Sequence, residues 1–322
     1  MSKKEILRRL NTLRIKPSGL QQRKYGVSVK YFSGNEQTPS KRIDYEVTTD
    51  LNIDDYKGIL TINKENIFYN QHEAEGISEI LNNSISNALY PLQTHLNEKG
   101  LSTNEIFNIE EIKKRWKNEK SKLLENYSSV ALDEFFNAID KKIEDISGLE
   151  KGLQNDWFWN LFFHPKFINY GETRKAKAAL FLSIIPYQPA VRFPGIQTIN
   201  KIPTDYHSFV IDFQSEELHA DYYFIRNISG KTDYFMSLKV IFDLDVYHHF
   251  PMHIRVYFEV YSKDLNGNKN FIKKINYTQY QQNTEEFKHK KLDKSSPFIT
   301  GGLVVSEPNK WGFYKNEYEN DW

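Results

Sequence analysis

The amino-acid sequence predicts an α+β fold, in which N-terminal antiparallel strands with a helical layer precede an antiparallel β lobe, either a sandwich or a curved sheet. Apolar residues alternate at period two from Tyr25 to Tyr69, recur at helical spacing up to Trp157, and alternate again after Gly171. A chain of 322 residues is long enough for two lobes. We therefore expect a basic arm over 1–24, a strand-helix-hairpin lobe over 25–170, and an antiparallel β lobe with an acidic aromatic tail over 171–322.

The N-terminal lobe opens with three strand-like segments, separated by turn-forming residues: YGVSVKYF, KRIDYEVTTDL and GILTINKENIFY. An apolar stripe then predicts a helix over about 73–89, which the capping pair Asn70 and Glu73 would start and Pro91 would end. The NEKG turn between PLQTHL and LSTNEIF predicts a hairpin.

Three further apolar stripes follow at helical spacing. The first runs from Ile109 to Tyr127, the second from Leu132 to Ile146, and the third starts at Leu149. The third stripe enters the aromatic run DWFWNLFFHPKFINY at 156–170. Since this run lies where helical spacing gives way to strand alternation, we expect it to pack the helical layer against the sheet.

The C-terminal lobe is clearest over residues 252–280. Ile254, Val256, Phe258 and Val260 alternate with polar and aromatic residues, and DLNGNKN supplies a hairpin loop. One face of this sheet is therefore expected to be core. The other face, with Arg255, Tyr257 and Tyr261, is expected to be solvated or bound to a partner.

Composition limits the classes of function. The chain has 43 basic and 42 acidic residues, so no overall field favours nucleic acid or membrane. It has no cysteine, which excludes disulfides and thiolate ligation of metals. No apolar run reaches the length of a membrane span, and the N-terminus does not resemble a secretory signal, so we expect a cytoplasmic protein.

The N-terminal arm is strongly basic. Residues 1–24 carry eight basic side chains against Glu5 alone. A solvated arm is the ordinary interpretation of such a segment, and nucleic-acid binding through the arm and through the Lys113 to Lys122 face is an alternative.

The segment FDLDVYHHFPMH holds the densest set of possible metal ligands, which are Asp243, Asp245, His248, His249 and His253. Carboxylates with imidazoles suit zinc, iron or manganese if the side chains converge. Asp243 and Asp245 alternate with Leu and Val, however, which is also the pattern of a half-buried strand. A metal-dependent hydrolase is therefore an alternative hypothesis.

The main hypothesis is non-catalytic binding of another protein, by an adaptor, an assembly component or a toxin-immunity protein. No phosphate-binding loop and no nucleophile elbow occur, so we expect no cofactor. Aromatic residues supply large contact areas at low entropic cost. The candidate binding residues lie on the outward strand face and in the C-terminal tail: Arg255, Tyr257, Tyr261, Tyr314, Tyr318 and Trp322.

Overall fold

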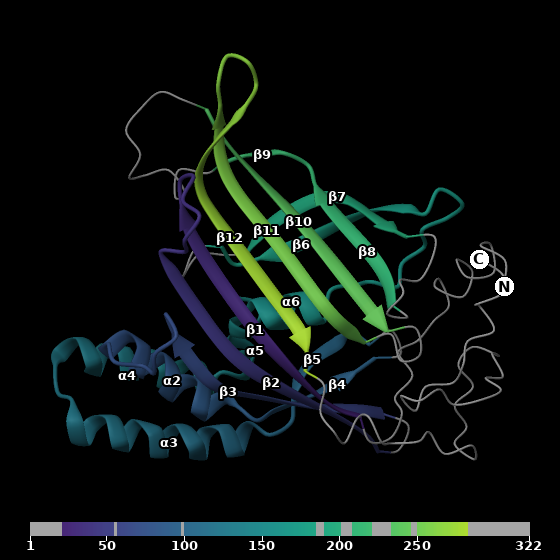
Figure 1. Ribbon diagram of the computed structural model, residues 1–322. Coiled ribbons are helices and arrows are strands. Elements are labelled where there is room, and N and C mark those ends of the chain that lie inside the picture. The colour runs from purple at the N-terminus through teal and green to yellow at the C-terminus, as the bar shows by residue number, and fades with distance from the viewer. Residues whose placement is uncertain are drawn as a thin grey trace.

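The structure is a computed structural model, which describes residues 21–54, 57–97, 100–184, 190–200, 208–220, 233–245 and 250–282. Within these residues, twelve antiparallel strands form one sheet and five helices lie along it (Figure 1). This arrangement confirms the predicted α+β class. The strands are β1 (Gln21–Ser33), β2 (Lys41–Asp54), β3 (Lys57–Tyr69), β4 (Leu92–Leu96), β5 (Ser102–Ile106), β6 (Lys175–Leu182), β7 (Val191–Ile199), β8 (Ser208–Ser215), β9 (Leu218–His219), β10 (Tyr234–Asp245), β11 (Pro251–Lys263) and β12 (Lys269–Gln281).

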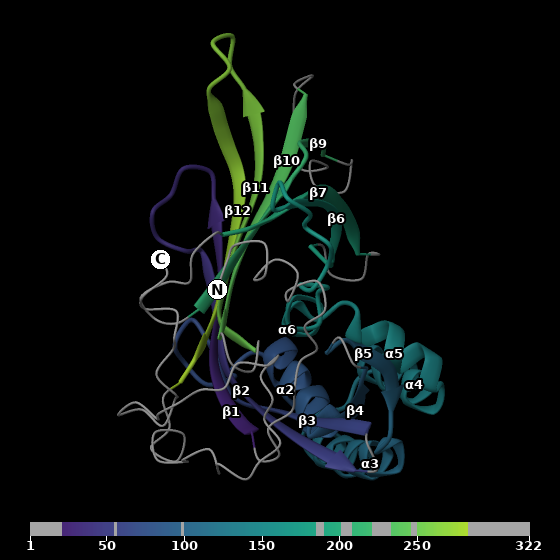
Figure 2. The same ribbon diagram turned by 90° about the vertical axis from the view of Figure 1, so that its right-hand side faces the viewer.

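The strand order joins the two predicted lobes into one sheet. The order is β5-β4-β3-β2-β1-β12-β11-β10-β8-β7-β6, with β9 paired to β10. The first strand, β1, pairs with β12, so that Val29 lies opposite Tyr277. The strands at both ends of the sheet bend toward the helices, which therefore lie in its concave face (Figure 2).

The concave face carries the core because the strands alternate as the sequence predicts. In β11, Ile254, Val256 and Phe258 are buried, while Arg255 and Tyr257 point to the convex face. The predicted hairpin loop connects β11 to β12, and Gly267 adopts a positive φ of 82° there.

The helices are α2 (Ile77–Leu89), α3 (Ile109–Asn126), α4 (Val130–Glu144), α5 (Ile146–Leu153) and α6 (Trp157–Phe162). Helix α2 begins four residues later than the expected start at about 73, because the side chain of Glu79 accepts a hydrogen bond from Gly76 N at 3.2 Å. Ser129 caps α4 by accepting from Leu132 N at 3.2 Å.

The aromatic run at 156–170 is a core junction, as predicted. It forms α6 and the segment after it, and Phe162 is 4% exposed. The Phe162 ring lies 5.9 Å from the Tyr25 ring of β1 and 6.2 Å from the Phe250 ring, which precedes β11. One short helix therefore packs against strands that lie far apart in the sequence.

Candidate functional site

A cavity of about 690 Å³ lies between the helices and the first three strands of the sheet. Protein interiors are normally close-packed and contain few voids larger than a water molecule, whereas ligand pockets measure roughly 300–1,000 Å³. Packing of the two layers therefore leaves room for a small molecule. The apolar and aromatic lining residues are Val29, Tyr31, Ile43, Tyr45, Ile67, Tyr69, Ile85, Ala88, Leu89, Tyr90, Ile112, Trp116, Phe135, Ala138, Ile139, Ile143, Leu149, Leu153 and Trp157.

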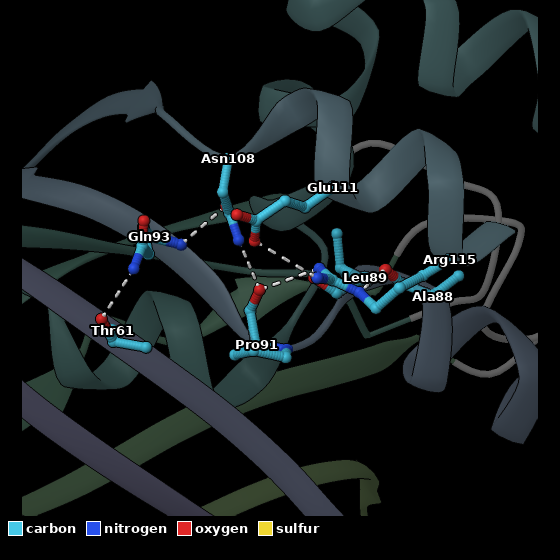
Figure 3. A network of polar contacts seen from close by, with 8 residues as sticks. All are labelled: Thr61, Ala88, Leu89, Pro91, Gln93, Asn108, Glu111 and Arg115. Carbon is cyan, nitrogen blue, oxygen red and sulfur yellow. Dashed lines mark hydrogen bonds and ion pairs between the residues drawn. The ribbon is translucent and has the colours of Figure 1, made fainter.

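Two walls of the cavity, α2 and α3, are tied together by a polar network (Figure 3). The guanidinium of Arg115 in α3 donates to the carbonyls of Ala88 and Pro91 at 2.9 Å each, at the end of α2. The side chain of Asn108 donates to the Pro91 carbonyl at 2.7 Å and accepts from Gln93 N at 3.0 Å. A cation at a helix C-terminus satisfies carbonyls that have no partner within the helix, so this network holds the two walls in register.

One ion pair joins the sheet to the helical layer inside the cavity. Lys64 Nζ of β3 lies 3.3 Å from Asp156 Oδ2 and 4.0 Å from the centroid of the Tyr45 ring. The second oxygen of Asp156 accepts from Trp159 N at 3.1 Å and caps α6. Asp156 therefore positions α6 and holds the ammonium of Lys64 at the same time.

Three buried tyrosines interact electrostatically with the Asp156 carboxylate of this pair. Burial, with the carboxylate of Asp156 adding to it, raises the pKa of Tyr45, Tyr90 and Tyr277 well above its ordinary value. Their phenols are therefore even further from ionisation at pH 7 than an ordinary tyrosine. They contribute apolar rings and hydroxyl groups rather than charge.

The cavity reaches the protein surface, because some of its lining residues are solvent-exposed. These residues share polar or small side chains and come from β2, α2, α4, α5 and the segment before α6: Lys41, Asn82, Ala138, Lys142, Gly152 and Asn155. We call this set the rim. A ligand can therefore enter from solvent, since the lining is not closed on every side.

The predicted metal ligands Asp243 and Asp245 interact with different arginines. Asp245 is buried and forms an ion pair with Arg23 of β1 at 3.0 Å, so it does not lie on the solvated strand face expected for it. Asp243 lies opposite His253 and 3.6 Å from the guanidinium of Arg255. Burial raises the pKa of Asp243 and lowers the pKa of His253.

His248 and His249 lie outside the described residues. Among the residues that the structure does describe, no group of three or more histidine, aspartate or glutamate side chains is arranged to hold a metal ion. The metal-dependent hydrolase stays an untested alternative.

The predicted binding residues of the outward strand face differ in exposure. Tyr257 is 38% exposed, and Arg255 also lies on the convex face. Tyr261 is 2% exposed and its hydroxyl donates to Glu217, so its ring is not presented to solvent. Tyr280 is exposed too, but its ring covers Gly26 on the neighbouring strand, where a Cβ atom would lie 2.5 Å from it.

Tyr314, Tyr318 and Trp322 lie outside the described residues, and so does most of the basic arm. Of the arm, Arg23 is buried, and Lys24 forms an ion pair with Glu46 at 2.8 Å. Protein binding and nucleic-acid binding both stay predictions.

A buried polar cluster beside α6 has no counterpart in the sequence analysis. His164 Nε2 lies 2.8 Å from Gln197 Oε1, and Lys166 Nζ donates to the carbonyls of Phe162 and His164 at 2.7 and 3.0 Å. Burial lowers the pKa of His164 to about 4 and that of Lys166 to about 7. This cluster is part of the packed core and does not line the cavity.

Sequence reasoning also missed the cavity, although it identified most of the apolar stripes that line it. The spacing of apolar residues shows which face of a helix or strand is buried, but it does not show how closely two packed layers approach each other. The unusual signal was the pair of glycines in α5, Gly148 and Gly152, which line the cavity on one side of a short helix. Of these two glycines, Gly152 leaves open space, because a Cβ atom there meets no atom within 4 Å, whereas a Cβ atom at Gly148 would lie 3.1 Å from the Asp145 carboxylate.

Comparisons with known proteins give no family for this chain. No family model and no curated protein matches it. The fold is similar to a solved structure described as lipid-protein interactions in lipovitellin, with 7% identity, 84% of this chain and 25% of that chain covered, and a TM-score of 0.40. At this TM-score the likeness carries no argument about function. Within the described residues, no helix is both long enough and apolar enough to cross a membrane.

Proposed function

We propose that this protein binds a small, largely apolar molecule in the cavity between its helical layer and strands β1 to β3. The observation that supports this proposal is the cavity itself, with a volume of about 690 Å³ and a lining that is mostly aliphatic and aromatic. A ligand that fills an apolar space of this size makes dispersion contacts with its walls, and these contacts favour binding.

The lining favours binding over catalysis. The described part of its lining includes no histidine, and the one carboxylate there, that of Asp156, is held by Lys64 and by the backbone of α6. The buried phenols of Tyr45 and Tyr90 are neutral at pH 7, as tyrosines ordinarily are, and burial raises their pKa further from the working pH. General acid and base catalysis works best with groups that titrate near the working pH, and these two phenols do not. The proposed activity is therefore reversible binding.

Binding of an uncharged fluorescent probe, N-phenyl-1-naphthylamine, to the full chain tests the proposal. Its fluorescence should rise on binding to the wild type and saturate with protein concentration. Gly152→Leu should reduce probe affinity at least tenfold, because a Cβ atom at Gly152 meets no atom within 4 Å and the larger side chain can occupy the cavity. Ala138→Phe in α4 should act in the same way.

Ala131→Phe is the matched control, since Ala131 is exposed two turns earlier in α4 and does not line the cavity. It should leave probe affinity within twofold of the wild type, and thermal melting should show that all three variants stay folded. No saturable binding by the wild type would overturn the proposal. Equal binding by folded Gly152→Leu, Ala138→Phe and wild type would place the probe elsewhere and overturn it too.

A further inference from the structure

The charged side chains around the cavity are unbalanced. Among the described residues, three lysines line it, Lys41, Lys64 and Lys142, against one carboxylate, that of Asp156. This leaves a formal excess of two positive charges in the lining. Lys64 is already paired with Asp156, so the excess belongs to Lys41 and Lys142.

Both of these lysines belong to the rim. Lys41 starts β2, and Lys142 lies near the end of α4 on the side that faces the cavity. Neither side chain forms an ion pair with any residue in the described ranges of the chain. Lys120 of α3 differs in this respect, since it forms an ion pair with Asp140 of α4 at 2.6 Å.

We propose that the ligand is an amphiphile with an anionic head, bound with its head at Lys41 and Lys142 and its apolar body inside the cavity. This inference rests on the proposed function and adds the class of the ligand. An apolar body suits the aliphatic and aromatic walls. A cleft with low-dielectric walls and charge of one sign at its opening concentrates the field and attracts the opposite charge.

The Lys64–Asp156 pair favours one orientation of the ligand over the other. Because its charges compensate each other, this half-buried pair offers no free cation to an anionic head placed beside it. An anion placed there would also meet the carboxylate of Asp156. A cationic head at the rim would be repelled by Lys41 and Lys142. The favourable arrangement therefore has the anion at the rim and the hydrocarbon inside.

Three probes that share a dodecyl hydrocarbon chain test the inference by isothermal titration calorimetry: dodecanoate, dodecanol and dodecyltrimethylammonium. The two ionic probes are used below their micelle concentrations, and dodecanol is used below its solubility limit. Dodecanoate should bind the wild type at least tenfold more tightly than dodecanol, and the cationic probe should bind most weakly. Added salt should weaken dodecanoate binding and leave dodecanol binding unchanged, because exposed charges are screened.

The double variant K41Q/K142Q should lose at least fivefold in dodecanoate affinity and stay within twofold for dodecanol. Lys141→Gln is the control, since Lys141 is exposed next to Lys142 and does not line the cavity, and it should change neither affinity by more than twofold. Equal affinities for dodecanoate and dodecanol, or an unchanged dodecanoate affinity in K41Q/K142Q, would overturn the anionic head while leaving the cavity as a binding site. Failure of all three probes to bind would overturn the proposed function as well.

Discussion

Replacing Arg23 by Met should destabilise the fold far more than the same change at a partly exposed arginine. The guanidinium of Arg23 lies 3.0 Å from Asp245, and the two side chains are 2% and 8% exposed. It also donates to Gln281 at 2.8 Å and lies 4.9 Å from the centroid of the Phe250 ring. Arg23 therefore joins the start of β1 to the ends of β10 and β12.

The size of the effect follows from the burial of the pair. Coulomb attraction at this distance is about 5 kcal/mol at an effective dielectric constant of about 20, and desolvation of both ions offsets much of it. Removing one partner leaves the other charge buried, which costs about 3–5 kcal/mol. We expect this loss in the free energy of unfolding of Arg23→Met, measured by urea denaturation at pH 7.

Arg42→Met provides the matched control. Arg42 also pairs with an aspartate, Asp44, at the shorter distance of 2.7 Å, but the two side chains are 34% and 22% exposed. Exposed pairs contribute about 0–1 kcal/mol. If Arg23→Met costs no more than Arg42→Met, burial does not control the strength of these pairs and the reasoning is refuted. The double variant R23M/D245N should lose less than the sum of its two single losses.

Three other predictions concern the core and the convex face. Burial lowers the pKa of Lys166 from 10.5 to about 7, so between these pH values the unfolded chain binds more protons than the folded chain. The free energy of unfolding of the wild type should therefore rise with pH over this window, by up to about 1.4 kcal/mol per pH unit. Urea titrations of the wild type and of Lys166→Met, which lacks this dependence, measure the difference. Phe162→Ala should lower the free energy of unfolding by about 3–5 kcal/mol in the same assay, because the ring is buried against Tyr25 of β1. Phe181→Ala, at a half-exposed ring of β6, should lower it much less. Equal losses would contradict the assigned core. Tyr257→Ala should leave the melting temperature unchanged, because the side chain is exposed. If the convex face is a protein-binding surface, the same change should weaken binding of a partner purified from the native host by about 2 kcal/mol or more. Unchanged affinity for that partner would remove Tyr257 from the interface.

The sequence by itself determined the class of fold and most of its elements. Alternation at period two predicts which residues of β11 enter the core, because a one-residue shift of register would expose Ile254, Val256 and Phe258 to water. Helical spacing predicts the apolar stripes of α3 and α4. The aromatic run at 156–170 indicated a junction because so much apolar surface must be buried somewhere.

Sequence patterns did not reveal which distant residues meet. Asp245 alternates with leucine in the manner of a solvated strand residue, yet it is buried because Arg23, 222 positions earlier, approaches it across the paired strands. Tyr261 shares the outward alternation of Tyr257 but is covered by its neighbours, since the register shifts at a bulge between Val260 and Tyr261.

The cavity could not be predicted from the sequence for the same reason: it depends on contacts between distant segments. Local periodicity records which face of each helix and strand is apolar, and it predicted the faces from which Ile85, Trp116 and Ile139 line the cavity. It does not record the distance between layers. That distance is set by the curvature of the sheet, by the capping of α6 at Asp156 and by the clamp of Arg115 on α2, all of which depend on contacts between segments far apart in the chain.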